Sequence, residues 1–164
     1  MEEAFGSLAF PGFQHRLCCQ QIYVAGHSSA GTLAVLFAEH EPRLAGCVAF
    51  APCIDLKARM PGCLIRTLSG ALEGLAEIIV HSSPLTHEQN LKCPIMVFHA
   101  ADDSNVPIQQ SRDFVERLKA AGKDATMAEV PTGDHYDSMI DQGILRGVEW
   151  MKEHGGTLVV DGNG

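Results

Sequence analysis

The sequence has no cluster of lysine and arginine, and its 12 basic and 20 acidic residues give a net charge of −8. Such a chain offers no basic surface for nucleic acid or an anionic membrane. Its apolar runs fall far short of the ~20 residues that a membrane-spanning helix needs. Acidic residues stand at the N-terminus, where a secretory signal carries basic ones, so we expect no export and a cytoplasmic protein.

No two cysteines are spaced as CxxC, and none stands at a zinc-like spacing from histidine. Without an export signal, we expect reduced and mostly buried thiols rather than a metal or redox site. We also expect no organic cofactor. The six cysteines are Cys18, Cys19, Cys47, Cys53, Cys63 and Cys93.

Strand-like and helix-like segments alternate along the chain, with no repeat or linker. The expected strands are 21–25, 45–52, 93–100 and 125–131, the expected helices are 29–40, 107–121 and 138–153, and a less regular helical stretch lies within 53–92. This alternation predicts an α/β fold with parallel strands and right-handed crossovers. We expect a single domain over 1–164, with an irregular lead at 1–20 and a loose tail at 154–164.

The apolar spacing also predicts which helical faces are buried. The helix at 29–40 is apolar on most sides, so it is expected to be largely buried. In the middle stretch, Gly70 and Gly74 weaken the helical pattern. The last helix is expected to face inward with Ile140, Ile144, Val148 and Met151.

The stretch "GHSSAG" follows the first strand and opens the first helix, which is the plan of a nucleophile elbow. Two interpretations stay open for its serines: a reactive hydroxyl on a strained corner, or a simple helix cap. Ser28 is favoured over Ser29 as the nucleophile, because its neighbours Gly26 and Ala30 are small whereas His27 is bulky. The N–H of Ser29 would then bind an oxyanion near the positive end of the helix dipole.

A serine nucleophile needs a base, and the base needs a group that orients it. The third strand ends in "HAADDSNVP", which offers Asp102 and Asp103, and the fourth ends in "PTGDHYD", which offers His135. The carboxyl ends of parallel strands meet at one edge of the sheet. The chain order Ser, Asp, His therefore predicts a hydrolase triad at that edge.

These motifs resemble the α/β-hydrolase superfamily, in particular the prolyl-oligopeptidase-like catalytic domain of the dipeptidyl-peptidase and acylaminoacyl-peptidase type. The resemblance covers about 21–153 and is most specific in "SPLTHEQNLKCPIMVFHAADDSNVP". It implies a three-layer fold with Ser28 as nucleophile, Asp103 as acid and His135 as base. Asp102, Asp134 and Asp137 are then polar loop residues, and His99 is a packed structural residue.

The sequence departs from this family pattern in two places. Ala30 occupies the last glycine of G-x-S-x-G, where its methyl group tightens the turn. Only some 20 residues precede the nucleophile strand, so the chain resembles the C-terminal half of the domain, an N-terminally truncated fold of about four strands. The loop that supplies the second oxyanion N–H is not visible, and the first strand becomes an open edge for a partner, a second copy or residues 1–20 to cover.

Three functional interpretations follow. The first is a serine hydrolase, active or latent, that cleaves a small ester or peptide. The resemblance places pocket-lining elements in 53–82, where Leu64, Ile65, Leu68 and Leu72 would make the pocket apolar; the alternative is that these residues belong to the core. The second is a non-catalytic interaction module that binds through the open edge. The third is an incomplete product without a stable fold.

Overall fold

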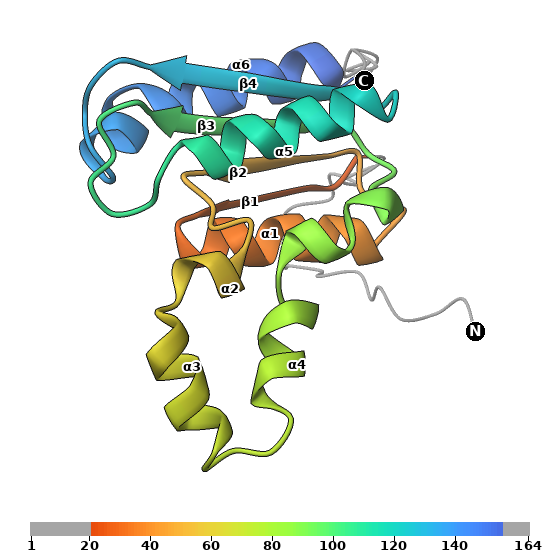
Figure 1. The fold of residues 1–164 in the computed structure, drawn as a ribbon. Coiled ribbons are helices and arrows are strands. Elements are labelled where there is room, and N and C mark those ends of the chain that lie inside the picture. Colours follow the sequence, from red (N-terminus) through yellow and green to blue (C-terminus); the bar gives the residue numbers. More distant parts are fainter. Residues whose placement is uncertain (1–20, 156–164) are drawn as a thin grey trace, which may run out of the picture.

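The computed structural model describes residues 21–155, which form a four-stranded sheet with helices on both faces (Figure 1). The strands are β1 (Tyr23–His27), β2 (Gly46–Phe50), β3 (Ile95–Ala100) and β4 (Ala125–Val130). They stand side by side in chain order, and each neighbouring pair is parallel. The predicted α/β fold with about four parallel strands is confirmed. The expected lead at 1–20 and the tail from 156 lie outside the described residues.

The helices follow the predicted order, with one stretch divided. They are α1 (Ser29–His40), α2 (Leu56–Arg59), α3 (Gly62–Ser69), α4 (Leu75–His81), α5 (Gln109–Ala120) and α6 (Ile144–His154), with short turns η1 (Pro84–Thr86), η2 (Glu88–Asn90) and a π-helical turn η3 (Met139–Gly143). The middle helical pattern is interrupted between α3 and α4, where Gly74 has a left-handed backbone with φ 79°. Glycine adopts that conformation without steric cost, so the weak point in the pattern becomes a turn.

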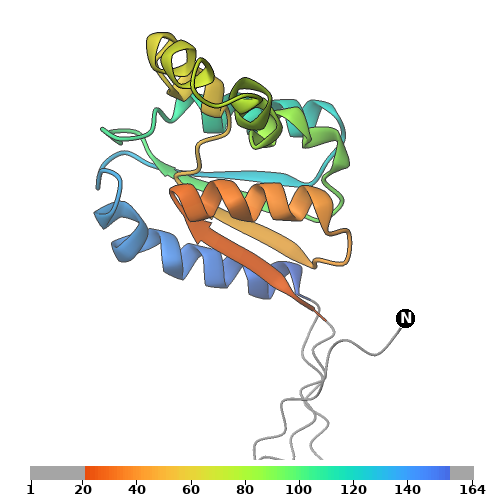
Figure 2. The ribbon, with the colours of Figure 1, turned by 90° about the horizontal axis from the view of Figure 1, so that it is seen from below.

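Helices α1 and α5 cover one face of the sheet and α6 covers the other (Figure 2). Val97 and Phe114 pack in the first interface, whereas Phe98 and Trp150 pack in the second. All residues of β2 and β3 are buried, because a parallel strand covered on both faces is apolar throughout. The three-layer arrangement is therefore confirmed.

The predicted inward face of the last helix is wrong for three of its four residues; the fourth, Met151, is partly buried against the core. Ile140, Ile144 and Val148 are 60%, 50% and 38% exposed. Gly147 faces the sheet instead, and a Cβ there would lie 3.0 Å from the Phe50 ring. The π-helical turn before α6 holds more residues than an α-helical turn, so it changes which side chains face the core.

The expectation that α1 is largely buried is also wrong for its outer side. Val35 and Ala38 are buried against the sheet, but Leu33 and Phe37 are 64% and 52% exposed. The cause lies in the topology: β1 is an edge strand, and α1 lies beside that edge (Figure 2).

Most cysteines within 21–155 are buried, as expected. Cys47, Cys53, Cys63 and Cys93 are all unpaired; Cys63 is exposed and the other three are buried. Cys18 and Cys19 lie outside the described residues. Within 21–155, no helix combines the length and the apolar character that crossing a bilayer requires.

Candidate active site

Ser28 stands on the corner between β1 and α1 in a strained backbone conformation, with φ 55° and ψ −121°. Only glycine fits at Gly26, because a Cβ there would lie 2.2 Å from the carbonyl oxygen of Ala30. The Ala30 methyl group that departs from the family pattern is accommodated, since Ala30 is exposed. The Ser28 N–H donates to the Phe50 carbonyl at 2.9 Å, which fastens the corner to β2.

The Ser28 side chain does not cap α1, because it makes no capping hydrogen bond. The helix-cap interpretation of Ser28 is therefore wrong. Ser29 is the first residue of α1, so its N–H precedes the hydrogen-bond ladder of the helix. The Thr32 hydroxyl donates to the Ser28 carbonyl at 3.2 Å and accepts from the Cys53 N–H at 2.9 Å. Thr32 thus joins the corner to the loop after β2.

Asp103 and His135 come together from the ends of β3 and β4. The Nδ1–H of His135 donates to Oδ2 of Asp103 at 2.8 Å, and their side chains are only 3% and 0% exposed. The N–H groups of Asn105 and Val106 both donate to Oδ1 at 2.8 Å. Burial raises the pKa of Asp103, but hydrogen bonds from His135 and from these two N–H groups outweigh it, so the pKa lies below its usual value. Asp103 is therefore ionised at neutral pH.

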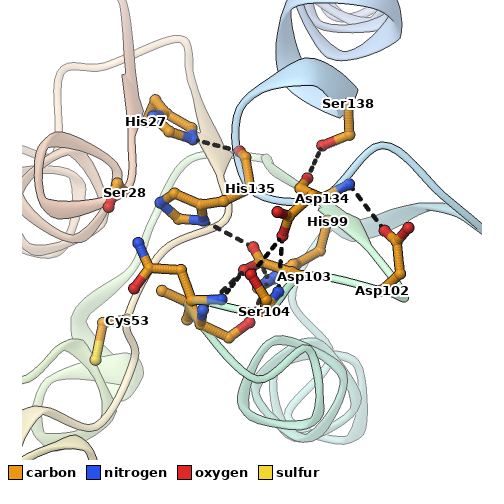
Figure 3. A network of polar contacts seen from close by, with 12 residues as sticks. His27, Ser28, Cys53, His99, Asp102, Asp103, Ser104, Asp134, His135 and Ser138 are labelled. Atoms are coloured by element: carbon orange, nitrogen blue, oxygen red, sulfur yellow. Dashed lines mark hydrogen bonds and ion pairs between the residues drawn. The ribbon is translucent and has the colours of Figure 1, made fainter.

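The other ring nitrogen of His135, Nε2, is buried and has no hydrogen-bond partner within 21–155. In Figure 3 the imidazole lies between Asp103 and Ser28, with Nε2 on the Ser28 side. Asp103 and His135 are thus joined by a direct hydrogen bond. Ser28 faces Nε2 of His135, but the two residues are not hydrogen-bonded to each other.

A second pair of acids fastens the two loops together. Asp102 accepts from the N–H groups of Gly133 and Asp134 at 3.2 and 2.9 Å. In return, Asp134 accepts from the Ser104 N–H at 2.8 Å and from its hydroxyl at 2.9 Å. This exchange holds Asp134 in a left-handed conformation with φ 47°. Both acids are loop polar groups, as predicted, and their hydrogen bonds fix the position of the His135 loop.

Two histidines beside this pair have contacts that the sequence did not reveal. The His27 ring donates through Nε2 to the backbone carbonyl of His135 at 2.8 Å. His99 is fully buried, as predicted, but its Nε2 also lies 3.1 Å from Oδ2 of Asp103. His27 occupies the variable position of the serine motif, and its partner is far away in the sequence, so no local pattern could have indicated that contact.

The segment 53–82, expected to provide pocket-lining elements, is open to solvent over much of its length. Helices α3 and α4 project from the sheet as an arm (Figure 1), and Leu64 and Leu72 are 43% and 55% exposed. A groove of about 510 Å³ lies instead between α1 and α4, lined by Leu33, Leu36, Phe37, His40 and His81. Among the described residues, no group of three or more His, Cys, Asp or Glu side chains could hold a metal ion.

Comparison with known proteins assigns the family. The model of the prolyl oligopeptidase family matches residues 14–157, so the chain belongs to that family. The rat acylamino-acid-releasing enzyme is 21% identical over 154 residues, which cover 84% of this chain and 21% of the enzyme. The relatives of the chain are serine peptidases and esterases.

Two solved structures share the fold. The acylaminoacyl peptidase of Pyrococcus horikoshii superposes with a TM-score of 0.65 at 19% identity, over 81% of this chain and 24% of that one. A butyrate-bound esterase of Thermogutta terrifontis superposes with a TM-score of 0.64 at 21% identity, over 83% and 57%. The chain thus has the α/β-hydrolase fold and spans about a fifth of the length of the rat enzyme.

Proposed function

We propose that the chain is a serine hydrolase that cleaves an ester or amide bond through an acyl-enzyme on Ser28. The observation that carries this function is the buried pair of His135 and ionised Asp103, whose remaining nitrogen faces the strained serine corner. Membership of a family of serine peptidases and esterases supports the same chemistry.

The proposed reaction begins when Oγ of Ser28 attacks the substrate carbonyl while Nε2 of His135 takes its proton. Asp103 holds the opposite nitrogen, Nδ1, in its protonated form and stabilises the imidazolium that results. His135 then returns the proton to the leaving group, and the acyl group stays on Ser28. In the second half, His135 activates a water molecule that releases the acid and restores the serine hydroxyl.

The tetrahedral oxygen would be bound by the N–H of Ser29 at the start of α1, where the helix dipole favours negative charge. Ser29 is one such donor. Loss of one oxyanion donor typically lowers kcat by ~10²–10³, so a chain that relies on Ser29 alone would turn over slowly. Covalent labelling of the serine is therefore a more sensitive test than turnover.

Labelling with a fluorophosphonate probe tests the assignment. The full chain is expected to be labelled, and Ser28→Ala is expected to lose the label completely because the probe bonds to the attacking oxygen. Ser82→Ala, in the turn after α4, is the matched control and should label like the natural chain. A folded natural chain without label, or equal labelling of Ser28→Ala, would exclude the proposed nucleophile.

The substrate class is proposed only as far as a small ester or a short peptide. Hydrolysis of p-nitrophenyl esters and of peptide anilides by the same sample would separate the two. We expect the ester to react faster, because its leaving group needs less help from His135 than an amine does. Faster cleavage of the anilide would assign the chain to the peptidases instead.

A second function, binding through the open sheet edge, is favoured by β1. Its residues carry no charge, proline or bulge, the devices that usually protect an edge strand from pairing. Exposed Ile22 lies directly before β1. We propose that a second copy of the chain covers this edge, by antiparallel pairing of two β1 strands, whether or not the chain is catalytic.

Light scattering coupled to size exclusion tests the pairing. We expect a dimer, and we expect Ala25→Lys to produce a monomer because two lysines would face each other across the two-fold axis. Ala120→Lys, at an exposed position on α5, is the control and should remain a dimer. A natural chain that is monomeric at tens of micromolar, or a dimeric Ala25→Lys variant, would contradict pairing through β1.

A further inference from the structure

His99 lies near the end of β3, and each of its two ring nitrogens makes a polar contact with a neighbouring residue. Nε2 lies 3.1 Å from Oδ2 of Asp103 and 2.9 Å from the carbonyl oxygen of Val106. Both are acceptors, so Nε2 carries the proton and shares it between them. Nδ1 lies 2.9 Å from the hydroxyl of Ser111, which donates to it. The ring is thus held in one tautomer by contacts on both sides.

The surroundings of His99 keep it neutral. Its side chain and that of Ser111 are fully buried. Burial lowers the pKa of His99 and outweighs the hydrogen bonds to Val106 and Asp103 that raise it. A neutral ring in this tautomer can only donate to Asp103, and it cannot remove a proton from a substrate.

Oδ2 of Asp103 therefore accepts from two histidines, from Nδ1 of His135 at 2.8 Å and from Nε2 of His99 at 3.1 Å. Oδ1 accepts from two backbone N–H groups. With four donors and no exposed surface, the carboxylate has no freedom to rotate or to exchange a donor for water. The position of Oδ2 then fixes the direction of the His135 ring.

We propose that His99 is a positioning residue, which holds the Asp103 carboxylate so that His135 keeps Nε2 aimed at Ser28. This role rests on the proposed hydrolase function, because it has a catalytic consequence only if His135 acts as the base. His99 touches no substrate in this arrangement. It acts through Asp103.

The test compares His99→Leu, which removes the donor, with His99→Gln, whose side-chain amide can still donate to Asp103. With a p-nitrophenyl ester, kcat of His99→Leu is expected to fall about 10–100-fold at unchanged KM, the usual effect of losing a hydrogen bond to a charged group. His99→Gln should recover most of that loss. A residue that only filled the core would make both variants less stable without this difference between them.

A second measurement does not depend on activity. The Nδ1 proton of His135, buried and bound to a carboxylate, should give a resolved downfield proton signal that disappears in His135→Ala. We expect the signal to persist in His99→Gln and to shift or broaden in His99→Leu, as Asp103 loses its fixed position. If the natural chain neither hydrolyses esters nor takes up the probe, the hydrolase function fails, and this signal still decides the role of His99.

An unchanged signal and unchanged kcat in folded His99→Leu would overturn the assignment. If His99→Leu does not fold, Ser111→Ala takes its place, because losing the hydroxyl frees the ring to change tautomer. Its expected effect has the same direction and is smaller, about 2–10-fold in kcat. Ser111→Ala with the signal and kcat of the natural chain would then overturn the role of His99.

Discussion

Two buried carboxyl groups lie at opposite ends of α1, and their surroundings are opposite too. Asp103, near the start of α1, has a fully buried side chain and four hydrogen-bond donors. Glu39, near the end of α1, is 4% exposed, and neither of its oxygens has a hydrogen-bond partner within 21–155. Both side chains are buried, but within the described part of the chain only the Asp103 carboxylate has hydrogen-bond donors that compensate its negative charge.

The difference appears in their protonation. Burial raises the pKa of Glu39 to about 8, the negative charge of Glu88 adds to the rise, and Lys123 opposes it. The pKa of Asp103 lies below its usual value, because its donors outweigh its burial. Donors rather than depth thus decide whether a buried acid is charged. At neutral pH the sheet end that carries Ser28 holds the ionised acid.

The largest effect is expected from removing the charge of Asp103. Asp103→Asn keeps the shape of the side chain but turns an amide towards His135, which favours the wrong tautomer. We expect kcat for a p-nitrophenyl ester to fall by about 10⁴, as in serine hydrolases with an equivalent change. Steady-state kinetics at pH 7 to 8 measure it, with a thermal melt to show that the variant is folded.

The neighbouring acid provides a matched control. Asp102→Asn removes one charge from the same loop and keeps an acceptor oxygen for one of the two backbone N–H groups, of Gly133 and Asp134, that bind separate oxygens of Asp102. We expect kcat to change less than about tenfold, the cost of weakening one hydrogen bond to a charged group. Equal losses in Asp102→Asn and Asp103→Asn would show that the loop charge matters and the contact with His135 does not.

The sequence was sufficient to predict most of the features at the sheet end that carries Ser28. The parallel strands, the strained corner at Ser28 and the contact between Asp103 and His135 all follow from local patterns in the sequence. Their positions agree with the structure because parallel strands bring their ends to one edge. The donors from His27 and His99 could not be predicted: His27 reaches a carbonyl far away in the sequence, and the His99 contact depends on how the loop after β3 folds back onto the ring.

The sequence predicted the buried faces of helices α1 and α6 less well. Leu33 and Phe37 on α1 look like core residues by their spacing, yet they are exposed in the groove between α1 and α4. On α6, the π-helical turn changed the inward face from Val148 to Gly147. An apolar period shows that a helix has a face to cover. It does not show whether the chain supplies the element that covers it, or where an extra residue changes the phase.

The next largest effect concerns Glu39 and depends on pH. Its folded pKa of about 8 exceeds that of the unfolded chain, so its contribution to stability is complete below about pH 4.5 and is lost as pH rises towards 8. Glu39→Gln removes this loss. Relative to the natural chain, the variant should gain on the order of a few kcal/mol at pH 9 and little or nothing at pH 4.5. Urea unfolding at several pH values measures the difference.

Glu41, just beyond Glu39, is the matched control. Hydrogen bonds from Arg43 lower the pKa of Glu41 to about 2. Its contribution is therefore present above the unfolded pKa and is lost only in acid, so Glu41→Gln should not alter the decline between pH 4.5 and 8. A decline that persists in Glu39→Gln would assign it to another group and would remove the contrast between the two buried acids.

The smallest effect concerns the neighbour that raises the pKa of Glu39. Glu88→Gln removes the negative charge that raises the pKa of Glu39, which favours ionised Glu39, and it breaks the ion pair that Glu88 forms with Arg117 at 2.5 Å. The pH at which the stability loss is complete should fall by a few tenths of a unit, and high salt should reduce that shift. The exposed ion pair itself contributes little, and its loss does not vary between pH 5 and 9. Glu116→Gln, at an exposed acid on α5, should leave the pH profile unchanged; an equal shift there would mean that net charge, and not proximity to Glu39, sets the effect.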